Sequence, residues 1–283
     1  MLSVVIPSLG GKVLNNTISS LNSGSIIPDE ILISLPSLEH MNHVNISDHN
    51  VRLINANCHS QVGQRIYGFK MAQYEYVLQL DDDIILDIKC IEILMDAMKK
   101  TKMSSFSPYY INFQNNSAHH TKKSHNPIMA IYYWIVNGRK GYVPGTIAKA
   151  GINFGVNKND ISEECNQIEV EWQPGGCVLH RRRNLIFNNY FPFSGKAYSE
   201  DLIHSFLLKN NNLKLVTCLD AYCYIDKDIG LLCIKDIIND FKARKYFVEM
   251  ASLGKIRMYV FYWFVILKYI YLKARLLANR RSF

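Results

Sequence analysis

The sequence predicts an α/β fold in which a largely parallel β-sheet is covered by helices on both faces. Three observations favour this class. The hydrophobic pattern of the first 85 residues indicates strand, helix, strand, strand, helix and strand in turn. The strand segments are almost entirely apolar, as in sheets that are buried on both faces. Three aspartates follow the last of these strands, at the edge where parallel sheets bind ligands.

The elements of this half follow from local signals. The first run, LSVVIPSL, is rich in β-branched residues and is closed by a proline and a serine, which indicates a strand. The next segment has apolar residues at helical spacing and ends at Ser and Gly. By the same reasoning the order is a strand at 2–9, a helix at 12–25, strands at 29–37 and 51–56, a helix at 63–73, a strand at 75–83, a helix at 88–100 and a strand at 104–113.

The second half is less regular. Residues 114–171 form a polar excursion over the sheet edge that contains one aromatic island, MAIYYWIV. VEWQPGGCVLHRRRNL then predicts a strand, a tight turn and a strand, followed by a helix at 199–212 and a strand at 213–225. We expect a catalytic domain at 1–230, with a nucleotide half at 1–112 and an acceptor half at 113–230, and a helical segment at 231–283.

The composition favours a folded cytoplasmic protein. At 283 residues, 48% hydrophobic and 20% charged, the chain suffices for one large or two modest domains. Its seven cysteines are odd in number and never spaced as CxxC, which favours reduced thiols over disulfides or a zinc site. The N-terminus MLSVVIPS has strand character and lacks the pattern of a signal peptide.

The positive charge is concentrated in one tail. Residues 254–283 carry seven Lys or Arg and no Asp or Glu; subtracting these seven from the net charge of +8 leaves +1, which argues against a nucleic-acid-binding face. The 10 apolar residues Met258 to Leu267 are too few to span a bilayer. Helical spacing places Arg257, Lys268 and Arg275 within about 20° of one another. We expect this tail to lie on a membrane surface, with packing on the protein or homo-oligomerisation as the alternatives.

The aspartates of VLQLDDDIILD are the main candidate site. Asp81, Asp82 and Asp83 repel one another, and burial of one costs several kcal/mol without a compensating cation or donors. Alternation along an extended chain sends Asp81 and Asp83 to one side, where they could share a divalent ion. Taken alone, the motif is better explained by a solvated turn whose aspartates cap the helix that begins near Asp87.

Four segments, taken in order along the chain, favour the metal site over the solvated turn. Together they resemble glycosyltransferase family 2 of the GT-A superfamily over about residues 1–225. They are SVVIPS, GQRIYGFKMAQYEYVLQLDDDI, WQPGGCVLHRR and YSEDLIHSFLLK. The resemblance implies a Rossmann-like GT-A fold, here with basic aromatic helices added at the C-terminus. It also implies that Asp83 binds the metal, that Asp81 contacts the ribose or the metal with Asp82 between them, that Pro7 and Ser8 line the nucleotide pocket, and that Arg65 approaches the base or diphosphate.

The resemblance gives the second acidic pair a role. It implies that Asp201 is the base that takes the proton of the acceptor hydroxyl in an inverting transfer, with Glu200 orienting the acceptor. On residue type alone, both acids are explained as first-turn residues of a helix. Gly175 and Gly176 would let the backbone approach a ligand closely, although a plain hairpin explains them equally well. For Arg65 the alternative is an exposed helix arginine paired with Asp81.

Mg²⁺ or Mn²⁺ and a nucleotide diphosphate sugar are the implied cofactor and donor, with a UDP-sugar favoured. Two departures from the family pattern leave details open. The second strand runs into Ser34 and Leu35, where many relatives have an acid that reads the base. After the last core strand, Tyr224 and Asp226 stand where relatives often have a metal-binding histidine. His119, His120 and His125 lack ligand spacing, so we expect them in a mobile loop near the site.

The sequence therefore predicts an inverting, metal-dependent glycosyltransferase of the hexosyltransferase type. Its acceptor would be a hydroxyl of a saccharide, lipid-linked in the case of bacterial surface polysaccharide synthesis, and the enzyme would be peripheral to the inner face of the cell membrane. Two alternatives stay open. One is a catalytically inactive GT-A domain that serves as a membrane-bound assembly partner. The other, disfavoured because SLGGKV lacks a GxGxR loop, is a sugar-phosphate nucleotidyltransferase.

Overall fold

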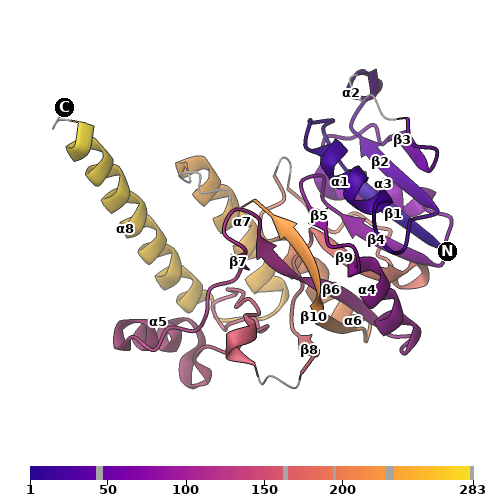
Figure 1. Cartoon of the computed structure of the whole chain (residues 1–283). Helices are drawn as coiled ribbons and strands as arrows, with labels where there is room; N and C mark the ends of the chain where they lie inside the picture. Colours follow the sequence, from indigo (N-terminus) through magenta and orange to yellow (C-terminus); the bar gives the residue numbers. More distant parts are fainter. Residues whose placement is uncertain (43–46, 162–164, 194–195, 227–232, 281–283) are drawn as a thin grey trace.

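The computed structural model describes residues 1–42, 47–161, 165–193, 196–226 and 233–280. Its centre is one mixed sheet with the strand order β3-β2-β1-β4-β9-β6-β10-β5 (Figure 1). The pairs β1·β2, β1·β4, β2·β3 and β6·β10 are parallel, and β9 lies antiparallel between β4 and β6. The strands are β1 (Leu2–Pro7), β2 (Glu30–Leu35), β3 (Val51–Asn55), β4 (Tyr76–Leu80), β5 (Ile85–Leu86), β6 (Ser104–Asn112), β7 (Ser117–Ala118), β8 (Gln167–Val170), β9 (Cys177–Arg181) and β10 (Lys214–Ile225).

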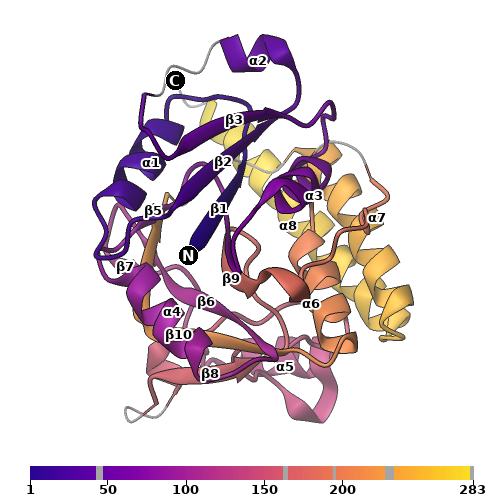
Figure 2. The ribbon, with the colours of Figure 1, turned by 90° about the vertical axis from the view of Figure 1, so that its right-hand side faces the viewer.

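Helices cover both faces of this sheet, which confirms the predicted fold class. On one face α1 (Leu14–Asn22) and α4 (Cys90–Lys99) pack against the strands, and on the other lie α3 (Gln61–Met71) and α6 (Glu200–Asn210) (Figure 2). Alternate residues of one strand face opposite layers: in β1, Val4 belongs to the α1 and α4 core, whereas Val5 packs with Phe69 of α3. A short helix, α2 (Leu38–Asn42), follows β2.

Two helices follow the sheet at the C-terminus. The helix α7 (Ile234–Met250) buries Phe247 and Val248 in the same cluster as α6, and α8 (Lys255–Arg280) joins this cluster through Met258 and Tyr262. Beyond these first turns α8 extends away from the sheet (Figure 1). No helix among the described residues is both long and apolar enough to cross a bilayer. The predicted boundary at residue 230 and the end of the tail, 281–283, lie outside the described residues.

The structure corrects two expectations for the second half. The hairpin interpretation of QPGGC is wrong, because β8 pairs with β10 whereas β9 pairs with β4 and β6. The aromatic island is a helix, α5 (Pro127–Asn137), whose N-terminus is capped by the Asn126 side chain accepting from Ile128 N at 2.9 Å. Trp172 is a core residue whose Nε1 donates to the carbonyl of Phe154.

Candidate active site

The three aspartates lie directly after β4, at the carboxyl end of the parallel strands. Asp82 is held by the first strand and helix, because Ser8 Oγ donates to its carboxylate and Thr17 Oγ1 donates to its carbonyl at 2.8 Å. Asp81 N donates to Gly176 O at 2.7 Å, which joins this end of β4 to the turn before β9. Asp83 is the exposed member of the run. The turn thus has one carboxylate used in structure and one open to a ligand.

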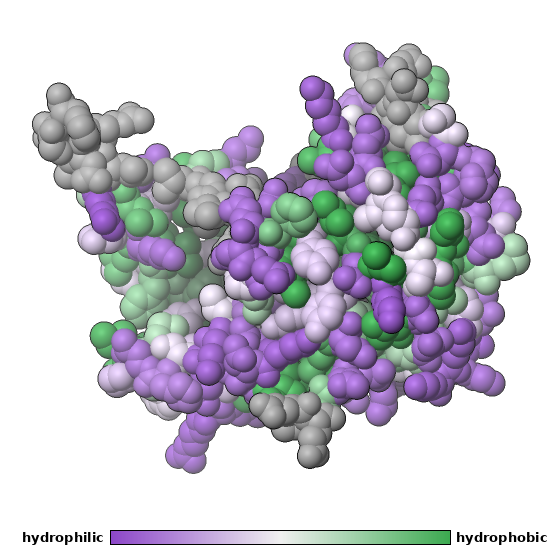
Figure 3. Space-filling view, viewed as in Figure 1, coloured by the Kyte–Doolittle hydropathy of each residue, from purple (hydrophilic) through white to green (hydrophobic). Residues whose placement is uncertain are grey.

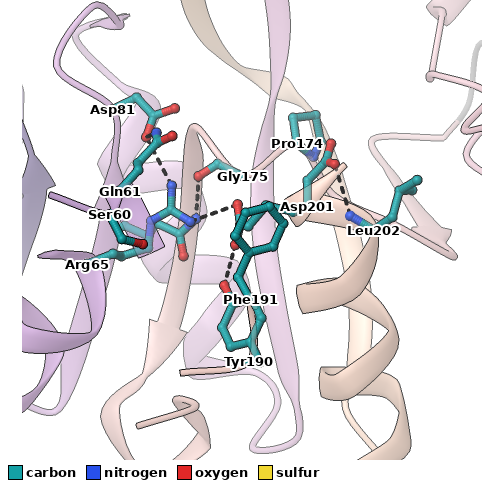
Figure 4. A network of polar contacts seen from close by, with 12 residues as sticks. Ser60, Gln61, Arg65, Asp81, Pro174, Gly175, Tyr190, Phe191, Asp201 and Leu202 are labelled. Carbon is teal, nitrogen blue, oxygen red and sulfur yellow. Dashed lines mark hydrogen bonds and ion pairs between the residues drawn. The ribbon is translucent and has the colours of Figure 1, made fainter. Parts of the chain in front are cut away.

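Arg65 occupies the centre of the site. Although it lies on α3, its exposed fraction is only 1%. Its Nη2 is 3.2 Å from Asp81 Oδ1, and its Nη1 is 2.9 Å from Glu200 Oε2. Figure 4 shows Arg65 with Asp81 and Gln61 on one side and Tyr190 on the other. The pairing with Asp81 that the sequence suggested is present, but the expected exposure is not, because the guanidinium is enclosed between the two acidic segments.

Glu200 faces protein groups on both of its oxygens. Oε2 pairs with Arg65, and Oε1 accepts a hydrogen bond from the hydroxyl of Tyr190. The Tyr190 ring stacks on His204, with centroids 5.4 Å apart and planes 8° from parallel, which fixes the direction of the hydroxyl. Burial raises the pKa of Glu200, but the charges of Arg65 and His204 and the hydrogen bonds from Tyr190 and Arg65 together outweigh it, so this pKa lies below its ordinary value. Glu200 is therefore a buried carboxylate anion.

Asp201, the next residue, has a different environment. Burial and then the negative charge of Glu200 raise its pKa to about 7, against the opposing charge of Arg244. Its Oδ1 accepts from Leu202 N at 2.9 Å, so it also satisfies one N–H of the first helical turn, as the capping interpretation expects. No ion pair involves Asp201 in the part of the chain that the structure describes. A carboxyl group with a pKa near 7 is suited to accept a proton at neutral pH.

The glycine pair lies between the two acidic segments. A Cβ atom on Gly175 would be 3.1 Å from Glu200 Oε2, and one on Gly176 would be 2.6 Å from Ile84 Cδ1 and 3.3 Å from Asp81 Oδ2. Gln79 of β4 donates to the carbonyl of Gly175. A side chain at either position would press against the carboxylates, so the close approach that we expected toward a ligand is made here toward Asp81 and Glu200.

The chemistry of the aspartate turn fits a divalent cation. Burial raises the pKa of Asp81 to about 6, with Arg65 opposing it, and burial followed by the charges of Asp82 and Asp226 raises the pKa of Asp83. A dication would relieve both effects. The described residues contain no cluster of three or more His, Cys, Asp or Glu placed to hold a metal. Two carboxylates nevertheless suit Mg²⁺ or Mn²⁺ when a diphosphate supplies further oxygens.

Several residues of this site were not predicted. Tyr190, Gln61 and Gln79 each contact a predicted site residue. Tyr190 and Gln61 lie outside the quoted motifs, whereas Gln79 lies within VLQLDDDIILD but was given no role. Tyr190 comes ten residues before Glu200, and no spacing rule links the two. Of the three histidines, His120 is packed within the protein: its ring lies edge-on against Trp172, and burial lowers its pKa to about 4.

Comparisons with known proteins agree with this architecture. The family model described as "Glycosyl transferase family 2" matches residues 3–147, just over half of the chain. No curated protein matches the sequence. The structure of GalNAc-T7 with UDP, GalNAc and Mn²⁺ is similar at a TM-score of 0.59 and 13% identity, over 80% of this chain and 43% of that one. S. aureus TarS gives a TM-score of 0.48 at 12% identity, over 91% of this chain and 41% of that one, which is too weak to support an inference.

Proposed function

The chain belongs to glycosyl transferase family 2, and on that premise we propose that it transfers a sugar from a nucleotide diphosphate sugar to a saccharide hydroxyl with inversion at the anomeric carbon. The observation that carries the proposal is the pair of acidic segments on either side of Arg65. One ends a parallel strand and leaves Asp83 exposed, and the other begins α6 with Asp201, whose pKa is near 7.

In this proposal Asp201 is the base. An acceptor hydroxyl loses its proton as its oxygen attacks the anomeric carbon, and Asp201 receives that proton. Its raised pKa supports the role, because the carboxylate is a stronger base than an ordinary aspartate and is still ionised to a useful extent at neutral pH. The absence of an ion-paired cation at Asp201 among the described groups leaves its lone pairs available.

The donor lies on the other side of Arg65. We assign the nucleotide to the end of β1, at Pro7 and Ser8, and the diphosphate to Asp83 and Asp81. Asp82 would hold the turn between these two aspartates, and Gly175 and Gly176 would line the site. Mg²⁺ or Mn²⁺ held there would supply positive charge to the departing diphosphate. A UDP-sugar is our favoured donor, in line with the UDP and Mn²⁺ in the GalNAc-T7 structure.

Arg65 and Glu200 act as positioning residues in this scheme. Arg65 is enclosed by the carboxylates of Asp81 and Glu200. This geometry favours a role in holding the donor side and the acceptor side together over a direct contact with the diphosphate. Glu200 uses both oxygens within the protein, so it would orient the acceptor only indirectly, by fixing α6 and with it Asp201.

The acceptor we propose is a lipid-linked saccharide of surface polysaccharide synthesis, reached from the inner face of the cell membrane. The basic, aromatic segment 254–283 supports this choice, because cations and aromatic side chains are favoured where lipid headgroups meet water. Attachment would be peripheral, through the surface of α8.

A donor screen tests the function directly. Nucleotide diphosphate sugars are added with Mn²⁺, and the melting temperature and the slow hydrolysis of donor without acceptor are measured; one donor should raise the Tm by mass action and be hydrolysed. Excess chelator should abolish both effects, whereas Asp83→Asn should weaken them. No Tm shift with any donor contradicts the proposal, and donor binding without hydrolysis or transfer favours the inactive assembly partner.

A further inference from the structure

The outward face of α8 is apolar and aromatic over residues 256–271. Its inner side is defined by the buried Met258 and Tyr262. The opposite side exposes large apolar or aromatic residues over more than four turns of the helix, at Ile256, Tyr259, Val260, Trp263, Phe264, Ile266, Leu267, Ile270 and Tyr271. Figure 3 shows hydrophobic side chains over α8, on the side of the molecule where α5 also lies. A soluble monomer rarely exposes so large a continuous apolar area.

Cations border this face on both edges. At about 3.6 residues per turn, Lys255 and Lys273 fall on one edge, and Lys268 and Arg275 fall on the other. All four side chains are exposed. Helical spacing places Arg257 on the same edge as Lys268 and Arg275, but its guanidinium is hydrogen-bonded to the backbone of α5. An apolar face between two rows of cations is the pattern of a helix that lies in the headgroup region of a bilayer.

The helix α5 has a second surface of the same kind. Ile128, Ile131 and Trp134 repeat at helical spacing and are 72%, 61% and 58% exposed. Four exposed cations flank the helix, two before it and two after it: Lys122, Lys123, Arg139 and Lys140. The exposed stripe of α5 thus combines apolar side chains and cations as the outer face of α8 does.

Arg257 joins the two helices. Its guanidinium donates to the backbone carbonyls of Trp134, at 2.9 Å, and of Ile135, and it lies over the Trp134 ring, 5.8 Å from the centroid. Phe261 of α8 packs against the cluster that includes Tyr133 and Val136 of α5. The C-terminal end of α5 is therefore held at the start of α8, which places the two exposed surfaces on adjoining parts of the molecule.

The charge of the two segments identifies the partner. Neither 97–159 nor 250–283, the stretches that contain α5 and α8, has a single Asp or Glu. A second copy of the chain would bring cations against cations here, whereas an anionic lipid surface complements them. We propose that α5 and α8 together form one docking surface for an anionic bilayer. This rests on the membrane attachment proposed above and extends it from α8 to α5.

Vesicle flotation with the full chain tests the proposal. Vesicles of phosphatidylcholine with phosphatidylglycerol are compared with phosphatidylcholine alone, for the wild type, the α5 variant Ile131→Glu/Trp134→Glu and the α8 variant Trp263→Glu. The control is Leu38→Glu on α2, where a leucine is 65% exposed outside both helices. We expect binding to anionic vesicles only, a loss of at least about tenfold for the α5 and α8 variants, and no change for the control.

Three results would overturn this inference: no binding of the wild type to anionic vesicles, wild-type binding by the α5 variant, or light scattering that shows a dimer which the α5 variant converts to a monomer. Equal melting temperatures and the donor-induced Tm shift measured without vesicles establish that each variant is folded. If the wild type shows the donor-induced Tm shift but does not bind anionic vesicles, docking alone is contradicted. If the wild type binds anionic vesicles but shows no donor-induced Tm shift, the proposed reaction alone is contradicted.

Discussion

The end of β4 provides the carboxylates of Asp81 and Asp83 to the site, with Asp82 holding the turn between them, and the start of α6 provides those of Glu200 and Asp201. Within each pair the two carboxylates have different surroundings. Asp81 and Glu200 lie on either side of Arg65 and are ion-paired to it. Asp83 and Asp201 have no ion pair in the part of the chain that the structure describes. Each pair thus contains one carboxylate that is bound within the protein and one that is open to a ligand or a proton.

The contrast is clearest between the neighbours Glu200 and Asp201. Both are shielded from water, which by itself raises the pKa of a carboxyl group, yet the pKa of Glu200 is lowered and that of Asp201 is raised to about 7. The difference arises because Arg65 pairs with Glu200, whose charge in turn acts on Asp201. One buried cation can therefore keep a structural carboxylate ionised and make the adjacent one more basic.

Among the variants that remove the difference between Glu200 and Asp201, Asp201→Asn should have the largest effect on activity. An amide keeps the shape of the side chain but cannot accept the acceptor proton, so kcat should fall by about 10²–10⁴-fold. The donor-induced Tm shift should persist, because the donor lies on the other side of Arg65. Asp220→Asn, at an exposed position of β10, is the matched control. Near-normal transfer by Asp201→Asn would show that the base is another group.

A second variant removes the shared cation. Arg65→Gln leaves Glu200 buried without its partner, which should lower the free energy of unfolding in urea by about 3–5 kcal/mol. Arg65→Gln/Glu200→Gln removes both charges and should recover part of that loss. If Arg65→Gln does not fold, the stability of the double variant still measures whether the Arg65–Glu200 ion pair can be replaced by two neutral side chains. Equal stability of the wild type and both variants would mean that Arg65 does not tie the two segments together.

The smallest effect expected is in the pH profile. Asp201 must be deprotonated to act, so kcat should rise with pH and level off above about pH 7, falling about tenfold per unit below it. Glu200→Gln removes the negative charge that raises the pKa of Asp201, and the acidic limb should move to lower pH. A profile without an acidic limb between about pH 5 and 8 would contradict the assignment of Asp201.

Much of the fold could be predicted from local patterns. The strand at 75–83, the helix at 199–212 and the strand at 213–225 correspond to β4, α6 and β10, because burial on a sheet or helix face leaves a readable periodicity. The polar composition of 114–171 predicts an irregular excursion where α5 lies, although Asn126 and Pro127 are an ordinary signal for a helix N-terminus. Its apolar residues are exposed on one side and buried on the other, so hydrophobicity alone did not separate it from its surroundings.

The sequence by itself determined most element types and the two acidic segments, since alternation and helical spacing are properties of neighbouring residues. Only the tertiary structure decided that Arg65 is enclosed by Asp81 and Glu200, that Tyr190 satisfies the remaining oxygen of Glu200, and that Arg257 holds α5 against α8. These contacts join residues 10 to 135 positions apart. The partner of a buried charge depends on which elements pack together, and no local pattern encodes that choice.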